Sequence, residues 1–124
     1  VSLQYVVLKE IIMAIENALI LSTDTTLLTV PAGKRYAITT IMICNTWLPN
    51  PDHEEDGETN FDMHFVPNGE PKGDQNMVIR ALILPAGETF TFDSEKVILD
   101  AGDSIIILGE SPTNLSATVS YLEV

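Results

Sequence analysis

Apolar and polar side chains alternate along much of the chain with a period of two residues. Residues 59–66 place Phe61, Met63 and Phe65 on one side and Asn60, Asp62 and His64 on the other. Residues 89–93 and 115–122 alternate in the same way. A β-strand with one face on a core and the other in water produces this period. The pattern therefore predicts half-buried strands, and no window carries a sustained helical stripe.

Segments rich in Thr, Val and Ile are separated by clusters of Pro, Gly, Asn and Asp, which is typical of strands joined by turns. The candidate strands are residues 18–21, 26–30, 35–46, 59–66, 76–84, 89–93, 96–99, 104–108 and 115–122. About eight short antiparallel strands in a chain of 124 residues predict an all-β fold, a β-sandwich or jelly roll. A chain of this length fits one domain, which we place at residues 14–124.

One turn sequence recurs, as VPAGK at 30–34, as LPAGE at 84–88 and more loosely as LDAGD at 99–103. We expect the proline to set φ at the second turn position and the glycine to adopt a conformation that other residues avoid. The three copies predict antiparallel strands that meet at one rim of the sandwich.

Two candidate strands are apolar on both faces, IMIC at 41–44 and IIIL at 105–108. One face of each strand would pack in the core. We expect a neighbouring subunit or a loop to cover the other face.

The net charge argues against two classes of partner, and the cysteine content excludes an intrachain disulfide. The 18 acidic residues outnumber the 6 lysines and arginines, and the net charge is −12. Nucleic acid and anionic membranes call for a basic surface, so we expect neither as a partner. The single cysteine, Cys44, excludes an intrachain disulfide and lies in an apolar run, where a thiol behaves as a small hydrophobe.

Residues 1–12 read VSLQYVVLKEII. They are too few to span a bilayer. A signal peptide has its basic residues before the apolar run, whereas here the only basic residue, Lys9, follows it. Codons for Lys9-Glu10-Ile11 can spell a bacterial ribosome-binding site upstream of Met13. One hypothesis is therefore that residues 1–13 are an extension outside the domain and that translation starts at Met13. The alternative, of equal weight, is an N-terminal helix or strand that docks on a partner.

Two groups of residues suggest metal chemistry. The acidic run at 52–58 could bind calcium, but it lacks the spacing of an EF-hand loop. Asp62 and His64 share one strand face, with His53 in the loop before it, and could hold a transition metal. We favour a solvated acidic loop for the first group and a wet strand face for the second. The sequence therefore predicts no metal ligands.

No catalytic or cofactor-binding residues are predicted either. The chain has no G-x-S-x-G elbow and no phosphate-binding glycine loop, so we expect neither an enzyme nor a cofactor. Trp47 stands just before the long loop at 48–58 and could be a stacking platform or an interface anchor. We favour a lid on the end of the sandwich.

From Met13 onward the chain resembles small virion structural proteins of tailed bacteriophages, especially those of marine cyanobacteria. The resemblance rests on VPAGK (30–34), YAITTI (36–41), CNT (44–46), HFVPNG (64–69), LPAGETFTFD (84–93) and LSATVSYL (115–122). The acidic loop at 52–58 is longer than is usual in such proteins. The resemblance implies a non-enzymatic component of the capsid, neck, tail or fibre, located in the virion. It also implies assembly with other virion proteins and with copies of itself, with a trimer favoured.

The main alternative is a carbohydrate- or receptor-binding β-sandwich module, which needs an aromatic platform. Aromatic residues make up only 6% of the chain, and most phenylalanines take core-facing positions. A trimeric jelly roll of the tumour-necrosis-factor or complement type is a third possibility, because the turn at 99–103 resembles one in that class.

Overall fold

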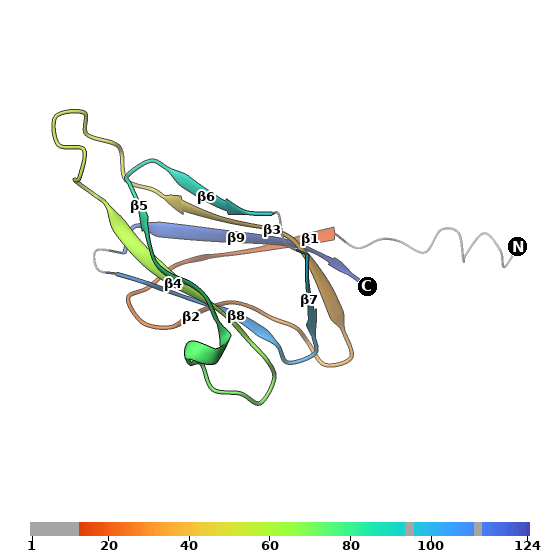
Figure 1. Cartoon of the computed structure of the whole chain (residues 1–124). Helices are drawn as coiled ribbons and strands as arrows, with labels where there is room; N and C mark the ends of the chain where they lie inside the picture. Colours follow the sequence, from red (N-terminus) through yellow and green to blue (C-terminus); the bar gives the residue numbers. More distant parts are fainter. Residues whose placement is uncertain (1–12, 94–95, 111–112) are drawn as a thin grey trace, which may run out of the picture.

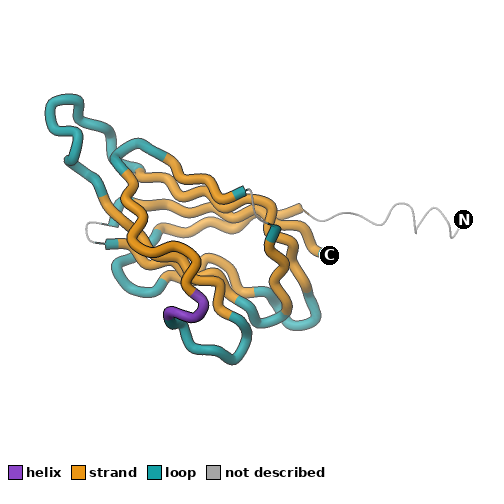
Figure 2. Tube along the Cα trace, in the orientation of Figure 1, coloured by secondary structure: helices purple, strands orange, loops and turns teal. Residues whose placement is uncertain are grey.

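The computed structural model describes residues 13–93, 96–110 and 113–124 as two antiparallel β-sheets that face each other (Figures 1 and 2). One short 3₁₀ turn, η1 (Asp74–Asn76), is the only helical element among these residues. The strands are β1 (Met13–Leu19), β2 (Thr25–Thr29), β3 (Arg35–Asn45), β4 (Thr59–Val66), β5 (Met77–Leu84), β6 (Thr89–Phe92), β7 (Val97–Asp100), β8 (Ser104–Gly109) and β9 (Leu115–Glu123). The all-β prediction and the two-layer sandwich are confirmed.

The pairing of the strands is nested. In the five-stranded sheet the order is β1-β9-β3-β6, and β7 also pairs with β3. In the four-stranded sheet the order is β2-β8-β4-β5. The first strand thus pairs with the last, the second with the one before it, the third with β6 and β7, and the fourth with the fifth.

The core lies between the two sheets and follows the alternation in the sequence. Six fully buried side chains at its centre come from β3, β4 and β8: Ile41, Ile43, Phe61, Met63, Ile105 and Ile107. Phenylalanines connect the layers, since Phe61 packs 5.9 Å from Phe90 and Phe65 packs 5.8 Å from Phe92, centroid to centroid. Burial of this apolar surface is the main force that holds the sheets together.

The strand predictions agree with the structure to within one residue at each end, except for the first. The predicted strand at 18–21 is wrong, because β1 covers Met13–Leu19. Its sequence, MAIENAL, has few β-branched residues, and it becomes a strand by pairing with β9 along its whole length. Of the predicted extension at residues 1–13, residues 1–12 lie outside the described part, and Met13 begins β1.

The recurring turns have the expected glycine conformation. Gly33, Gly87 and Gly102 have φ of 78°, 78° and 86°. The proline, however, takes the first position of the turn and not the second, because Lys34 N–H donates to Pro31 O and Glu88 N–H to Pro85 O.

The expectation that all three turns meet at one rim is also wrong. The turns at 30–34 and 99–103 are joined by Gly102 N–H donating to Val30 O, next to the first residue of β3. The turn at 84–88 is joined to Asn45, the last residue of β3, through Gly87 N–H and Asn45 O. An eleven-residue strand separates the two ends of the sandwich.

Candidate functional site

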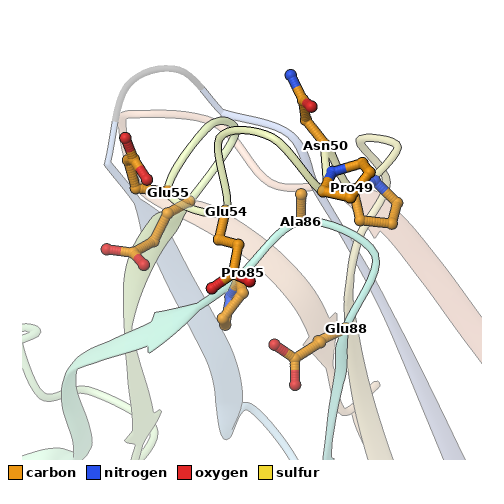
Figure 3. A pocket seen from close by; sticks show the side chains of 9 residues that line it. Pro49, Asn50, Glu54, Glu55, Pro85, Ala86 and Glu88 are labelled. Atoms are coloured by element: carbon orange, nitrogen blue, oxygen red, sulfur yellow. The ribbon is translucent and has the colours of Figure 1, made fainter.

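The long loop at 48–58 and the β5–β6 turn enclose a groove at the far end of the sandwich (Figure 3). Its volume is about 800 Å³. Figure 1 shows the loop projecting beyond the ends of β3 and β4. The lining residues are Pro49, Asn50, Pro51, Glu54, Glu55, Glu58, Pro85, Ala86 and Glu88. The predicted long loop is confirmed, because residues 48–58 contain no strand.

A buried asparagine fixes the base of the groove. Asn45, fully buried at the end of β3, donates through Nδ2 to Gly57 O at 2.7 Å and to Leu84 O at 2.9 Å. Its Oδ1 accepts from Trp47 N–H at 3.1 Å. The side chain therefore ties both arms of the groove to the end of the sandwich.

Close packing against two glycines holds the loop near the turn. Gly57 has φ +77°, and a Cβ added there would stand 2.5 Å from Cε3 of Trp47. Gly87 approaches Pro49 so closely that an added Cβ would lie 3.0 Å from the proline Cδ. Trp47 is nevertheless 46% exposed, so it is only partly the lid that the sequence suggested.

The chemistry of the groove is that of prolines and carboxylates. Four glutamates line it, and no lysine or arginine does. Figure 3 shows Glu54, Glu55 and Glu88 around the β5–β6 turn at Pro85 and Ala86. Four carboxylates without a lining cation favour a positively charged group over a negatively charged one in this groove.

The residues that the sequence analysis weighed as metal ligands, and did not predict as such, do not form a metal site in the structure. Across the described residues, no group of three or more His, Cys, Asp or Glu side chains is arranged to hold a metal ion. Asp62 Oδ1 accepts from Ala81 N–H at 2.7 Å. His64 is only 3% exposed, so the expectation that it lies on a wet strand face is wrong. The segment around η1 covers it, and its Nδ1 lies 3.0 Å from Asn76 Oδ1.

His53 lies in the projecting loop, whereas His64 lies five residues along β4 from Thr59, about 17 Å at 3.4 Å per residue. Asn76 Oδ1 also accepts from Gly73 N–H, and a side-chain amide oxygen carries no proton to donate. His64 Nδ1 therefore carries the proton and donates to it. Both Asp62 and His64 are thus used in holding local backbone structure.

The two strands that are apolar on both faces behave differently on their two sides. Ile41, Ile43, Ile105 and Ile107 are fully buried. Of the residues that alternate with them, Met42 is 43% exposed, while Cys44, Ile106 and Leu108 are half-buried. Their outward sides thus stay partly open in the single chain.

Comparison with known proteins adds no assignment. No protein-family model, no curated protein and no solved structure matches this chain. Among the described residues, none of the helical structure has the length and hydropathy needed to cross a bilayer.

Proposed function

We propose that the chain is a non-enzymatic structural subunit of a tailed-bacteriophage virion, in the capsid, neck, tail or fibre region, and that it acts by protein–protein assembly. We also propose that the two-sheet sandwich is a jelly roll. The nested pairing of β1 with β9, β2 with β8, β3 with β6 and β7, and β4 with β5 supports this, because a rolled-up ribbon of antiparallel strands gives that order. Jelly rolls recur in viral capsid proteins.

The observation that carries the proposal is an outward sheet face with little charge, on which the exposed Arg35–Asp100 ion pair takes the end of the β3–β7 ladder. Across β6, β3, β9 and β1, one row of outward side chains is Thr91, Met42, Thr118 and Asn17. A second row contains Thr89, Cys44, Ser116 and Leu19, and a third contains Thr40, Ser120 and Ile15. A fourth row begins on β7 and contains Ile98, Ala37 and Leu122. None of these side chains is charged, although 19% of the chain is.

Depletion of charge is the compositional mark of the centre of a protein interface. Four apolar side chains of this face are widely exposed: Met42 at 43%, Ile98 at 59%, Ile15 at 63% and Leu19 at 73%. In a protein of net charge −12, the rest of the surface keeps copies apart, and this face is where contact costs least. Partners are therefore copies of this chain, with a trimer favoured, and other virion proteins.

The proposal is tested on virions and on the purified chain. Quantitative mass spectrometry of nuclease-treated particles should find the chain in a fixed ratio to other structural proteins, and its absence from particles would refute the proposal. Met42→Glu should lower the mass of the assembled protein in light scattering. Thr26→Glu, a matched change at an exposed position of the other sheet, should leave that mass unchanged.

A carbohydrate- or receptor-binding module is the second candidate. It is favoured by the half-exposed Trp47 and by Leu48, 90% exposed, beside the groove. Binding on a glycan array that is lost in Trp47→Ala would support it over the structural role.

A further inference from the structure

Three of the four sheet edges in the described structure are interrupted. The edge strand β5 has two register shifts against β4 and a residue with positive φ, Ala81 at +48°. The edge strand β2 has five residues and a register shift between Thr26 and Leu28. The third edge is divided between β6 and β7, of four residues each. Bulges and short strands are the usual devices that stop an edge from pairing with another chain.

The fourth edge, β1, has none of these devices. Its register with β9 runs without a shift over seven consecutive pairs, from Met13↔Leu122 to Leu19↔Ser116. The strand contains no proline and no lysine, and its only charged residue is Glu16. A regular edge of this length offers a row of backbone donors and acceptors to a further strand.

The direction of those groups follows from one hydrogen bond. Ile20 N–H donates to Leu115 O at 2.9 Å, so the backbone of Ile20 points toward β9. Backbone groups alternate in direction along an antiparallel strand. The N–H and C=O groups of Ile15, Asn17 and Leu19 therefore point away from β9, to the open edge.

We propose that β1 pairs antiparallel with β1 of a second copy of this chain across a twofold axis at Asn17. The inference names one partner surface within the assembly proposed above, and in that sense it rests on the proposed function. The pairing joins the two β1-containing sheets into one continuous sheet, and it extends the charge-poor outward face across both copies.

The side chains of β1 select the register. Pairing centred on Glu16 would place two carboxylates directly opposite each other, which is destabilising. Pairing centred on Asn17 sets Ile15 opposite Leu19 of the partner subunit and Glu16 opposite Ala18 of the partner subunit. The two exposed apolar residues of the strand then cover each other, and the twofold axis repeats the contact, as a self-complementary interface requires.

The first test is the assembled mass in light scattering and sedimentation over a concentration series. Asn17→Pro removes an N–H that points to the open edge, and proline is tolerated at such edge positions. The mass should fall by a factor of two, from dimer to monomer or from hexamer to trimer. Asn17→Ala keeps the N–H and should leave the mass unchanged. A wild-type monomer, or equal masses for Asn17→Pro and wild type, would overturn the inference.

The second test fixes the register by cross-linking in a Cys44→Ala background. Hydrogen-bonded residues opposite each other have Cα atoms about 5.5 Å apart, within the range that a disulfide spans. Asn17→Cys should give covalent dimers on oxidation, and Glu16→Cys should not. Dimers from Glu16→Cys alone, or from neither variant, would contradict the pairing.

The two proposals can fail separately. Presence of the chain in virions with no effect of Asn17→Pro on the assembled mass would leave the structural role standing and remove the β1 contact. Absence from virions together with Asn17→Cys dimers would remove the structural role in the virion and leave the β1 contact standing.

Discussion

Asn114 and Asn45 lie 69 residues apart in the sequence, and their side chains meet inside the end of the sandwich, where Asn114 Nδ2 donates to Asn45 Oδ1 at 2.7 Å. Asn114 also donates to Gly57 O at 2.7 Å, and its backbone O accepts from Thr46 N–H at 2.8 Å. Its own Oδ1 is buried with no partner among the described residues. The pair joins β3, the start of β9 and the acidic loop in one buried network.

Removal of the first of these amides should loosen that end. Asn45→Ala deprives Leu84 O and Asn114 Nδ2 of buried partners, and unmade buried hydrogen bonds cost about 1–3 kcal/mol each. We expect the free energy of unfolding in urea to fall by about 2–3 kcal/mol. Asn17→Ala, at an exposed asparagine, should change it by less than about 0.5 kcal/mol. Equal values for the two variants would refute the role of the network.

Gly57 and Gly33 form a matched pair with nearly the same backbone angle, φ +77° and +78°. A Cβ at Gly33 meets no atom within 4 Å, whereas at Gly57 it meets the ring of Trp47. Gly33→Ala should therefore cost about 1–2 kcal/mol from backbone strain alone, and Gly57→Ala should cost more. Because Trp47 is the only tryptophan, its fluorescence should shift in Gly57→Ala and stay constant in Gly33→Ala.

Asp62 should prove to be a structural carboxylate. Its Oδ1 accepts the N–H of Ala81, the bulge residue with positive φ. Asp62→Ala should lower the free energy of unfolding by about 1 kcal/mol, while Asp56→Ala, in the exposed loop, should have little effect. Added zinc should leave the Tm of the wild type unchanged. A rise in Tm with zinc that Asp62→Ala abolishes would instead identify a metal ligand.

Tyr121 should make the protein sensitive to alkali. Burial raises the pKa of the Tyr121 phenol, and the nearby Tyr36 and Glu16 add to the increase. A raised pKa means that the folded state favours the protonated phenol. Its contribution to stability is therefore complete below about pH 10 and is lost as the pH rises through the folded-state pKa. Urea unfolding at increasing pH should show a steeper loss above about pH 10 in the wild type than in Tyr121→Phe. Parallel curves would contradict this.

The strand pattern was predictable because the alternation of apolar residues is local information. Phe61 and Met63 alternate with polar residues, so the pattern gives their inward direction, and the turn glycines mark where the chain reverses. The strand β1 was not predicted correctly, because its sequence MAIENAL has little intrinsic preference for a strand and is held extended by pairing with β9.

The candidate site was predictable only in its protruding loop. Pro85 and Glu88 join that loop because the β5–β6 turn lies at the Asn45 end of β3, and the turn sequence, shared with 30–34, contains no information about which end it takes. Asn45 and Asn114 were missed as network residues. The available signal was an asparagine that directly follows the apolar run IMIC at 41–44.

The sequence alone determined the strands other than β1, the inward faces of those strands whose apolar residues alternate with polar ones, and the places where the chain reverses. Each of these depends on side chains a few positions apart. Only the tertiary structure decided which strands are neighbours, which edge is left open and which polar groups are buried together. Those features depend on backbone and side-chain contacts between residues far apart in the chain, and no local pattern specifies the partner in such a contact.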